Sequence, residues 1–347
     1  MARPRLQDVA DQAGVSLATA SRVLNGSSRQ PGPGLVEKVR AAAADLGYVV
    51  NAQAQALARS RTGLLGLVVQ DISDPYFSTI AAGAQDAARA SGHLVLLAST
   101  GRDPVAEREA VAAFAAHRVD AVVVAGTRWA PEDDDALAAE LDRFVVAGGR
   151  SVVVGQPVGE GYVVRPPNAA GATALAEALL AQGHRRFAVL GGPATVVTSR
   201  ERAEAFVGAV RAGGGVVTDV LETEFSRDGG YAAGGAVADL VAGASDGTDP
   251  LCVFAVTDVM AIGAIARLRE LGVEVPRDVS LAGFDDVPTL RDHVPGLTTV
   301  RIPLEEMGRL AVRAAVVETV TAPGASPHGG VTEVEFDVVL RASTARS

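Results

Sequence analysis

The stretch LQDVADQAGVSLATASRVLN, residues 6–25, decides the fold of the N-terminal part of the chain. Gly14 ends a first predicted helix because glycine adopts left-handed turn geometry without steric cost. Ser16 is a favourable N-cap for a second helix over residues 17–24. The apolar residues of the first helix recur at helical spacing: Leu6, Val9, Ala10 and Ala13. The pattern indicates a helix-turn-helix, although an ordinary helical hairpin has the same spacing.

The same stretch carries a family resemblance. DVADQAGVS followed by TASRVLNG is similar to the N-terminal headpiece of the LacI/GalR family of bacterial transcriptional regulators. Later segments continue the resemblance: DISDPYFS (71–78), SRERAEAF (199–206), VTDVMAIGA (256–264), GFDD (283–286) and HVPGLTTV (293–300). The resemblance implies a DNA-reading headpiece attached to a ligand-binding core.

The second helix supplies the candidate DNA contacts. Ala20, Val23 and Leu24 can face inward, which leaves the opposite face for the major groove. Arg22 suits a bidentate contact to guanine, whereas Leu17 and Ala18, at the family's specificity positions, offer apolar contact such as that to a thymine methyl. The remaining candidates are short polar side chains suited to phosphates, and an asparagine better placed to cap the helix: Thr19, Ser21 and Asn25.

Charge is distributed unevenly along the 347 residues. The whole chain carries −10, which alone argues against a nucleic-acid partner. Residues 1–62, however, hold eight basic and four acidic side chains, so this segment is +4 and the remainder −14. A basic segment on an acidic body concentrates the attraction for phosphates where the helix-turn-helix lies.

Several sequence features that are missing bear on where the protein is located and on whether it is an enzyme. Cys252 is the single cysteine, no apolar run approaches the ~20 residues of a membrane span, and no signal peptide begins the chain. We therefore expect a cytoplasmic, nucleoid-associated protein with no membrane partner. G-x-S-x-G, H-E-x-x-H, Walker and metal-ligand spacings are missing. The expectation is no enzyme, no cofactor and no metal.

A short alanine-rich segment, AQAQALAR at residues 52–59, follows the headpiece. Its ~8 residues are below the length at which an isolated helix is stable in water, so a plain linker is one interpretation. The resemblance implies instead a hinge helix that folds on operator DNA in the minor groove. Leu57 matches the family's leucine that wedges between central base pairs.

From Leu64 onward strands and helices alternate in two runs, which predicts α/β architecture with two parallel sheets flanked by helices. The fold class is thus an all-α headpiece plus a two-lobe core like that of periplasmic binding proteins. Crossovers are expected near residues 164–168 and 294–299, and a terminal strand over 334–344. The predicted limits are a headpiece at 1–50, a hinge at 51–62, and a core at 63–347 with an N-terminal lobe (63–164 and 297–325) and a C-terminal lobe (165–296 and 326–347).

The resemblance assigns an effector site to the cleft between the lobes. Arginine, carboxylates and aromatic faces suit a sugar or nucleoside-like ligand. Taken alone, an aromatic pair at the start of a helix is also typical of a hydrophobic core. Each charged residue, taken alone, is also typical of a solvated loop or a helix cap. Asp286 is expected to be structural, and Pro167 replaces an acidic residue common in the family. The candidates are Tyr76, Phe77, Arg202, Phe225, Thr257, Asp258 and Asp285.

The leading hypothesis is a homodimeric repressor that binds a near-palindromic operator and is switched by a small effector, for which we expect a carbohydrate. A solute-binding protein of the same fold without a role on DNA is the alternative, and a sugar-modifying enzyme would need a catalytic pair that the sequence lacks. The operator, the effector, the direction of the switch and the choice between dimer and tetramer are not written in the sequence.

Overall fold

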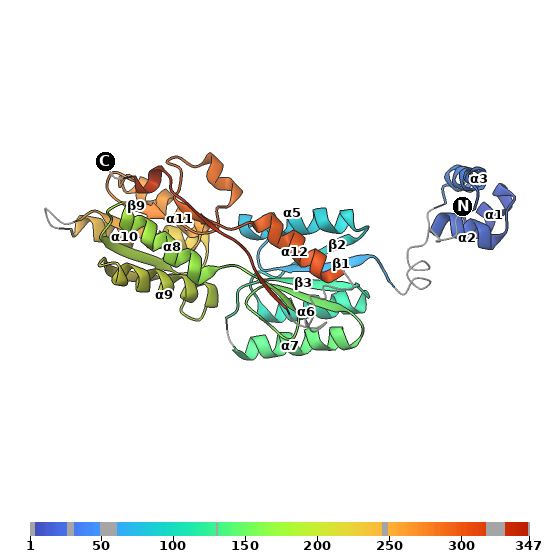
Figure 1. The fold of residues 1–347 in the computed structure, drawn as a ribbon, viewed down its shortest axis with the longest axis horizontal. Coiled ribbons are helices and arrows are strands. Elements are labelled where there is room, and N and C mark those ends of the chain that lie inside the picture. The colour runs from blue at the N-terminus through green and yellow to red at the C-terminus, as the bar shows by residue number, and fades with distance from the viewer. Residues whose placement is uncertain are drawn as a thin grey trace. The chain divides into compact units, whose positions relative to one another are not determined.

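The computed structural model describes residues 4–25, 31–48, 61–129, 131–244, 249–316 and 330–345. The chain separates into two compact units, Met1–Gly63 and Leu64–Ser347, called here the headpiece and the core (Figure 1). Leu57 and the predicted hinge helix lie outside the described residues, so the hinge and its wedge stay predictions.

The described residues of the headpiece form three helices, α1 (Leu6–Ala13), α2 (Leu17–Asn25) and α3 (Pro33–Asp45). Gly14 takes the left-handed conformation at φ +67°, and the Ser16 hydroxyl accepts the Thr19 N–H at 3.1 Å as the N-cap of α2. The small core that the helices share is built of short side chains: Val9, Ala10, Ala20, Val23, Val39, Ala42 and Ala43. These features confirm the helix-turn-helix.

The N-terminal lobe of the core is a six-stranded parallel sheet in the order β11-β5-β4-β3-β1-β2. Helices α5 and α12 cover one face and α6 and α7 the other (Figure 1). The central strand β3 is buried along its whole length, whereas the edge strand β2 is largely exposed. The bounds are β1 Leu64–Val69, α5 Pro75–Ala90, β2 Leu94–Ser99, α6 Pro104–Ala116, β3 Ala121–Gly126, α7 Pro131–Val146, β4 Arg150–Gly155, β5 Tyr162–Arg165, α12 Leu304–Val316 and β11 Val331–Glu333.

The C-terminal lobe is a four-stranded parallel sheet in the order β7-β6-β8-β9. Its helices pack as two pairs, α8 with α9 and α10 with α11. The central strand β8 is fully buried and includes Cys252. The bounds are α8 Asn168–Ala181, β6 Arg186–Gly191, α9 Val197–Ala212, β7 Val216–Glu222, α10 Arg227–Ala242, β8 Leu251–Ala255, α11 Asp258–Glu270, β9 Ser280–Ala282 and the 3₁₀ turns Pro288–Asp292 and Ala342–Thr344.

Within the described ranges the chain passes between the lobes three times. The first passage, at residues 166–167, agrees with the predicted crossover. The second follows β10 (Thr299–Arg301), which pairs antiparallel with β12 (Asp337–Val339). Thr298 still bridges to Ala282 of the C-terminal lobe, so this passage lies at residues 302–303 and not at the predicted 294–299.

The third passage corrects the predicted lobe limits. Strand β11 pairs with β5 in the N-terminal sheet, so the chain returns to the C-terminal lobe after Glu333 and not at residue 326. The expected terminal strand over 334–344 is reduced to β12 and a 3₁₀ turn. Both errors have one cause, since the short strands at the passages hold three residues each and have no apolar run to mark them.

Candidate functional site

A void of about 470 Å³, its mouth included, lies between the two lobes of the core. Its walls come from the segments that follow the carboxyl ends of strands in both sheets, where open α/β sheets bind ligands. Six of the seven predicted effector residues line it: Tyr76, Phe77, Arg202, Phe225, Thr257 and Asp285. The structure therefore brings together residues spread over more than 200 positions of sequence.

Arg202, on the second turn of α9, is fixed in the wall of this void. Its Nε donates to Asn168 Oδ1 at 2.9 Å and its Nη1 donates to the Val256 carbonyl at 2.8 Å. The guanidinium carbon stands 3.7 Å from the centroid of the Phe284 ring. Only 1% of the residue is exposed. None of these contacts uses Nη2. The guanidinium is therefore held rigidly while its Nη2 group can donate to a ligand.

Asp285 is the anionic partner of that arginine. Its Oδ1 lies 2.9 Å from Arg202 Nη1 and forms an ion pair with it. Burial raises the pKa of Asp285 to about 7, against the attraction of Arg202, and the nearby Asp74 adds to the rise. The residue has φ +117°, an uncommon backbone conformation outside glycine. A buried carboxyl group in the wall of the void, held by a strained backbone and one arginine, is suited to bind a ligand hydroxyl.

Aromatic side chains complete the void. Tyr76 and Phe77 begin α5 and meet edge to face, with ring centroids 5.0 Å apart. Burial raises the pKa of the Tyr76 hydroxyl, and the charge of Asp285 acts in the same direction. Phe225, from the segment after β7, packs its ring 5.8 Å from the Arg102 guanidinium carbon. Aromatic faces beside hydrogen-bonding groups bind the alternating apolar and polar surfaces of a sugar ring.

Asp258 is the predicted effector residue that the structure does not place in the void. Its Oδ2 accepts the Val287 N–H at 3.0 Å and its Oδ1 accepts the Thr299 hydroxyl at 2.6 Å. Burial raises its pKa well above the usual carboxyl value, and Asp285 adds to this. Asp258 thus ties together the segments that carry Asp285. Thr257 lines the void while its hydroxyl caps α11 through the Met260 N–H.

Polar contacts cross the void and join the two lobes. Arg102, after β2, donates from Nη1 to the Phe225 carbonyl, and Gln156, after β4, donates to the Thr198 hydroxyl at 3.0 Å. The Thr198 N–H in turn donates to Thr127 Oγ1 at 3.2 Å. The structure is therefore that of a core with its lobes closed on each other.

Several of these residues are absent from the sequence-based set. Gln70, Asp74, Arg102 and Thr198 line the void, and Asn168 orients Arg202 from the start of α8. A signal existed for the first group, because each follows a strand or begins a helix at the carboxyl edge of a sheet. Asp286 is structural as expected, since it accepts from Arg301 Nε and Arg341 Nη2, each at 2.7 Å.

The headpiece presents the outer face of α2 as its candidate DNA surface. Leu17 is 45% exposed, Ala18 and Arg22 are exposed, and Thr19 and Ser21 are half-buried. Arg22 Nε contacts its own helix through the Ala18 carbonyl at 3.2 Å. The Asn25 side chain, like Leu57, lies outside what the structure describes. No described helix is long and apolar enough to cross a membrane.

A helix-turn-helix headpiece on the same chain as a two-lobe ligand-binding core defines a ligand-controlled DNA-binding protein. The sequence comparisons agree with this class. Residues 5–51 match the family described as "Bacterial regulatory proteins, lacI family", and residues 176–344 match the "Periplasmic binding protein-like domain".

Full-length relatives place the chain more closely. It is 33% identical to the HTH-type transcriptional regulator MalR of Streptomyces coelicolor over 349 residues (98% of this chain, 96% of MalR). It is also 33% identical to CelR of Thermobifida fusca over 346 residues (97% of each). The chain belongs to the LacI family and is a DNA-binding transcriptional regulator. These relatives are named as regulators, not as enzymes or transport proteins.

Solved structures show the same fold. The Lac repressor dimer bound to operator and the anti-inducer ONPF matches with a TM-score of 0.81 and 25% identity, covering 99% of each chain. The CelR–cellobiose complex matches with a TM-score of 0.67 and 31% identity, covering 98% of this chain and 100% of that one. The fold prediction is thereby confirmed.

Proposed function

We propose that this protein is a dimeric repressor whose affinity for its operator is switched by a carbohydrate bound between the core lobes. The observation that carries the proposal is the void itself, in which Arg202 and Asp285 stand among aromatic faces. The wall holds two arginines, Arg102 and Arg202, and two carboxyl groups, Asp74 and Asp285, so it offers both donors and acceptors to the hydroxyls of a sugar. The printed ligand of the CelR complex, cellobiose, supports the same ligand class.

On the DNA side we assign the reading of bases to the exposed face of α2. Arg22 would contact a guanine edge, with Leu17 and Ala18 against apolar base edges and Thr19 and Ser21 at phosphates. We further propose that Leu57 inserts into the minor groove. Asn25 is retained as a contact or cap at the end of the helix. Two headpieces would read the halves of a near-palindromic operator.

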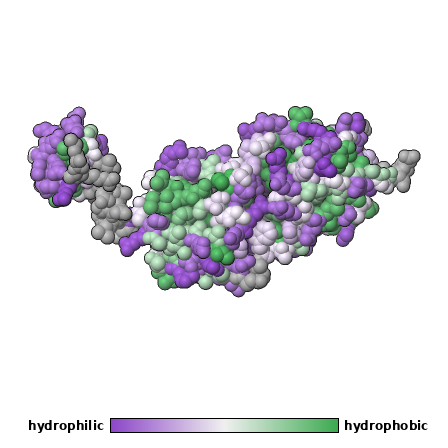
Figure 2. Space-filling model, turned by 180° about the vertical axis from the view of Figure 1, so that it is seen from behind, coloured by the Kyte–Doolittle hydropathy of each residue, from purple (hydrophilic) through white to green (hydrophobic). Residues whose placement is uncertain are grey.

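The dimer is proposed to form through the edge strand β2. Leu94 is 63% and Leu97 42% exposed on this strand, and Figure 2 shows a broad apolar area on the N-terminal lobe of the core. Exposed apolar patches of this kind mark association surfaces. Sedimentation velocity tests this: L94D/L97D should give a monomer, whereas Val216→Asp on the exposed edge strand β7 should remain dimeric.

The test of the DNA assignment uses the full chain and DNA duplexes selected from a random pool for binding. Fluorescence anisotropy should show affinity that falls steeply between about 50 and about 200 mM salt, because phosphate contacts release counterions. Arg22→Ala should lose about 1–3 kcal/mol of discrimination at one base pair. Leu57→Ala should reduce DNA bending. Binding that is insensitive to salt, or selection of no sequence, would contradict the proposal.

The effector assignment is tested by thermal shift with hexoses, pentoses and their disaccharides, because a ligand that binds only the folded state raises its apparent stability. A stabilising sugar should lose its effect in Arg202→Ala. Added to operator complexes, the same sugar should change the operator affinity. We expect no catalytic turnover of the sugar, and we place the protein in the cytoplasm on the nucleoid, where the operator is.

A further inference from the structure

The helices of the core differ in where their N-terminal amides find hydrogen-bond acceptors. An α-helix leaves its first four N–H groups without acceptors of its own. Helix α9 is preceded by Val196, whose side chain offers no acceptor. In contrast, α5, α6, α10 and α11 are each capped by the side chain of the residue that precedes them: Asp74, Asp103, Ser226 and Thr257. The first amides of α9 therefore need acceptors from another part of the chain.

The N-terminal lobe supplies those acceptors. The Val197 N–H donates to the Arg128 carbonyl at 3.0 Å, and the Thr198 N–H donates to Thr127 Oγ1 at 3.2 Å. Both acceptors directly follow β3, whereas α9 belongs to the C-terminal lobe. The Thr198 hydroxyl also accepts from Gln156 Nε2 at 3.0 Å. The first turn of α9 is thus capped by the opposite lobe.

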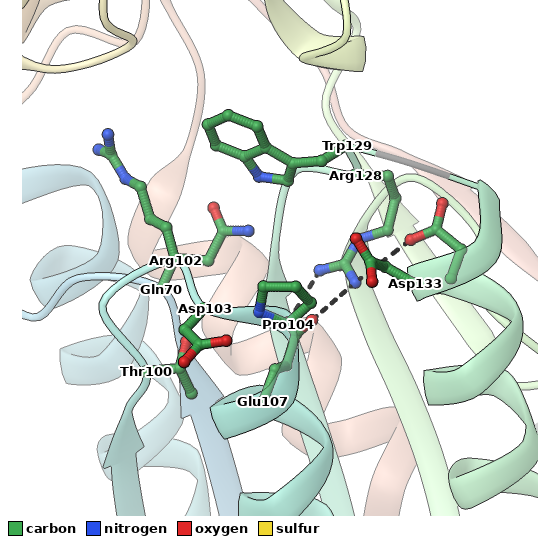
Figure 3. Close-up of a pocket in the computed structure, with 10 residues that line it drawn as sticks. Gln70, Thr100, Arg102, Asp103, Pro104, Glu107, Arg128, Trp129 and Asp133 are labelled. Atoms are coloured by element: carbon green, nitrogen blue, oxygen red, sulfur yellow. Dashed lines mark hydrogen bonds and ion pairs between the residues drawn. The ribbon is translucent and has the colours of Figure 1, made fainter.

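Contacts within the N-terminal lobe hold the two acceptors in place. Gln70 fixes the backbone of Thr127, because its Nε2 donates to the Thr127 carbonyl at 2.8 Å and its Oε1 accepts the Thr127 N–H at 3.3 Å. Arg128 is buried and donates to both carboxylate oxygens of Glu107 at 2.9 Å (Figure 3). None of these contacts involves α9. The acceptors therefore stay with the N-terminal lobe when the lobes separate.

We propose that α9 is capped only in the closed arrangement of the core, and that Thr127 is the positioning residue that supplies the cap and so favours closure. On opening, the N–H groups of Val197 and Thr198 lose both acceptors together. Arg202 lies four residues beyond Thr198 on the same face of α9, and both residues line the effector void. The cap therefore holds the void wall that carries Arg202 against the N-terminal lobe. This inference rests on the proposed function, since it concerns closure around the same effector.

Hydrogen exchange of the sugar-free, full-length protein, resolved to single amides, tests the proposal without a ligand. The Val197 and Thr198 amides should exchange faster than the Gly192 amide, which donates to Ser199 Oγ at 2.8 Å within the C-terminal lobe. Opening of the lobes exposes the first two amides and leaves the third hydrogen-bonded. Equal exchange rates at all three amides would overturn the proposal, because the α9 amides would then be released only by unfolding.

Thr127→Val removes the capping oxygen and keeps the shape of the side chain. It should speed exchange of both the Val197 and Thr198 amides about fivefold, which is the typical effect of losing a cap on an equilibrium constant. The Val197 amide retains its own acceptor, the Arg128 carbonyl, so it responds only if one opening releases both amides. An effect confined to Thr198 would contradict the proposal.

Two further variants control for a merely local change. Thr127→Ser keeps the hydroxyl and should restore the exchange rates of the unchanged protein. Asp103→Ala is the matched control, because the exposed Asp103 caps α6 through the Val105 N–H at 2.8 Å within one lobe. It should lower the free energy of unfolding and leave exchange at the start of α9 unchanged. Faster exchange there in Asp103→Ala, equal to that in Thr127→Val, would count against the cap.

Titration with D-glucose, D-galactose, D-xylose, cellobiose and maltose then relates the cap to the effector. A sugar that binds should slow exchange of the Val197 and Thr198 amides, and it should bind about fivefold more weakly to Thr127→Val, because fewer molecules are closed. If Thr127 only contacts the sugar, affinity falls while exchange of the sugar-free variant stays unchanged, which overturns the proposal. Failure of every sugar to bind contradicts the proposed function, and the sugar-free exchange rates still decide whether the cap exists.

Discussion

Arg202 and Asp285 are the pair of side chains on which the effector void depends. The guanidinium is buried against Phe284 and is satisfied by Asn168, Val256 and the carboxylate of Asp285. Each member of a buried ion pair offsets the cost of taking the other out of water. Removing one partner therefore affects both the folded state and ligand binding.

Arg202→Ala should lower the free energy of unfolding of the core by about 3–5 kcal/mol, because it leaves a buried carboxylate unpaired. Urea denaturation of the sugar-free protein measures this. Arg277→Ala is the control in the same lobe, since Arg277 is an exposed arginine paired with Glu274 and Asp278, and it should cost less than about 1 kcal/mol. Equal losses in both variants would show that the buried pair does not organise the site.

Asp285 should also make stability depend on pH. Its pKa of about 7 in the folded protein lies above the ordinary carboxyl value, so the folded state retains a proton that the unfolded chain has released. The free energy of unfolding of the ligand-free protein should therefore fall as pH rises from about 4 to about 7, and level off above that. Asp285→Asn should flatten this slope and raise stability at the alkaline end.

Melting temperatures of the two proteins across that range are the measurement. Some slope should remain in the variant, because burial raises the pKa of Asp258 in the same direction. A slope identical to that of the unchanged protein would show that Asp285 is ionised throughout.

At the scale of elements, helices α5 and α12 pack so closely that two glycines at their contact leave no room for a side chain. A Cβ added to Gly83 would overlap the carbonyl oxygen of Glu305, and one added to Gly308 would overlap that of Ile80. Both neighbours are main-chain atoms, which cannot move aside without shifting a helix. The contact fixes α12, the helix that follows the second passage between the lobes, onto the N-terminal lobe.

Gly308→Ala should destabilise the core by about 1–3 kcal/mol through overpacking. Gly208→Ala is the matched control, because Gly208 lies on the exposed face of α9 with no atom near an added Cβ. There alanine should stabilise by about 0.5–1 kcal/mol, as its helix propensity exceeds that of glycine. Chemical denaturation measures whether each substitution raises or lowers the free energy of unfolding. A decrease of equal size at both positions would refute the packing argument.

The strand–helix alternation was predictable because buried parallel strands such as β3 and β8 are continuous apolar runs, and most effector candidates follow such strands. Asp258 shows the limit of this reasoning. It begins α11 directly after the strand-end segment of β8, as a ligand-contacting residue would, yet its carboxylate turns to Val287 and Thr299. Spacing along the chain places a residue at the edge of a sheet but does not decide which way its side chain points.

The features that could not be predicted from the sequence depend on contacts between residues far apart in the chain. Strand β11 is recognisable only by its pairing with β5, since VTE has no apolar pattern. Arg128 and Glu107 lie 21 positions apart and form a buried ion pair. Neither residue stands in a motif that would single it out in the sequence.

At the scale of the whole molecule, the core can act as a switch because its two lobes are separate sheets. Three passages of chain connect them, and the polar contacts between them are individually weak: Arg102 to the Phe225 carbonyl, Gln156 to Thr198, Thr198 to Thr127, and the Val197 N–H to the Arg128 carbonyl. A ligand seated between the lobes stabilises the closed arrangement by its differential affinity for that arrangement. The proposed regulation of DNA binding requires the headpiece to respond to the same equilibrium.

Gln156→Leu should move that equilibrium toward the open arrangement, because it removes the donor to the Thr198 hydroxyl at 3.0 Å. It also removes the Oε1 acceptor of the Arg128 N–H within the N-terminal lobe, so the free energy of unfolding of the variant is measured alongside. We expect the variant to bind sugar more weakly. In the absence of sugar, its operator affinity should change in the direction opposite to the change that sugar causes in the unchanged protein. In the unchanged protein, sugar should alter operator affinity by the same factor by which operator alters sugar affinity, in the range of about 5–150-fold, since binding free energies are reciprocally linked. Anisotropy titrations with and without sugar, and calorimetric sugar titrations with and without operator, give the two factors independently. No change in operator affinity when sugar is added, or a variant in which sugar affinity falls while operator affinity stays constant, would show that the void and the headpiece do not share one two-state equilibrium.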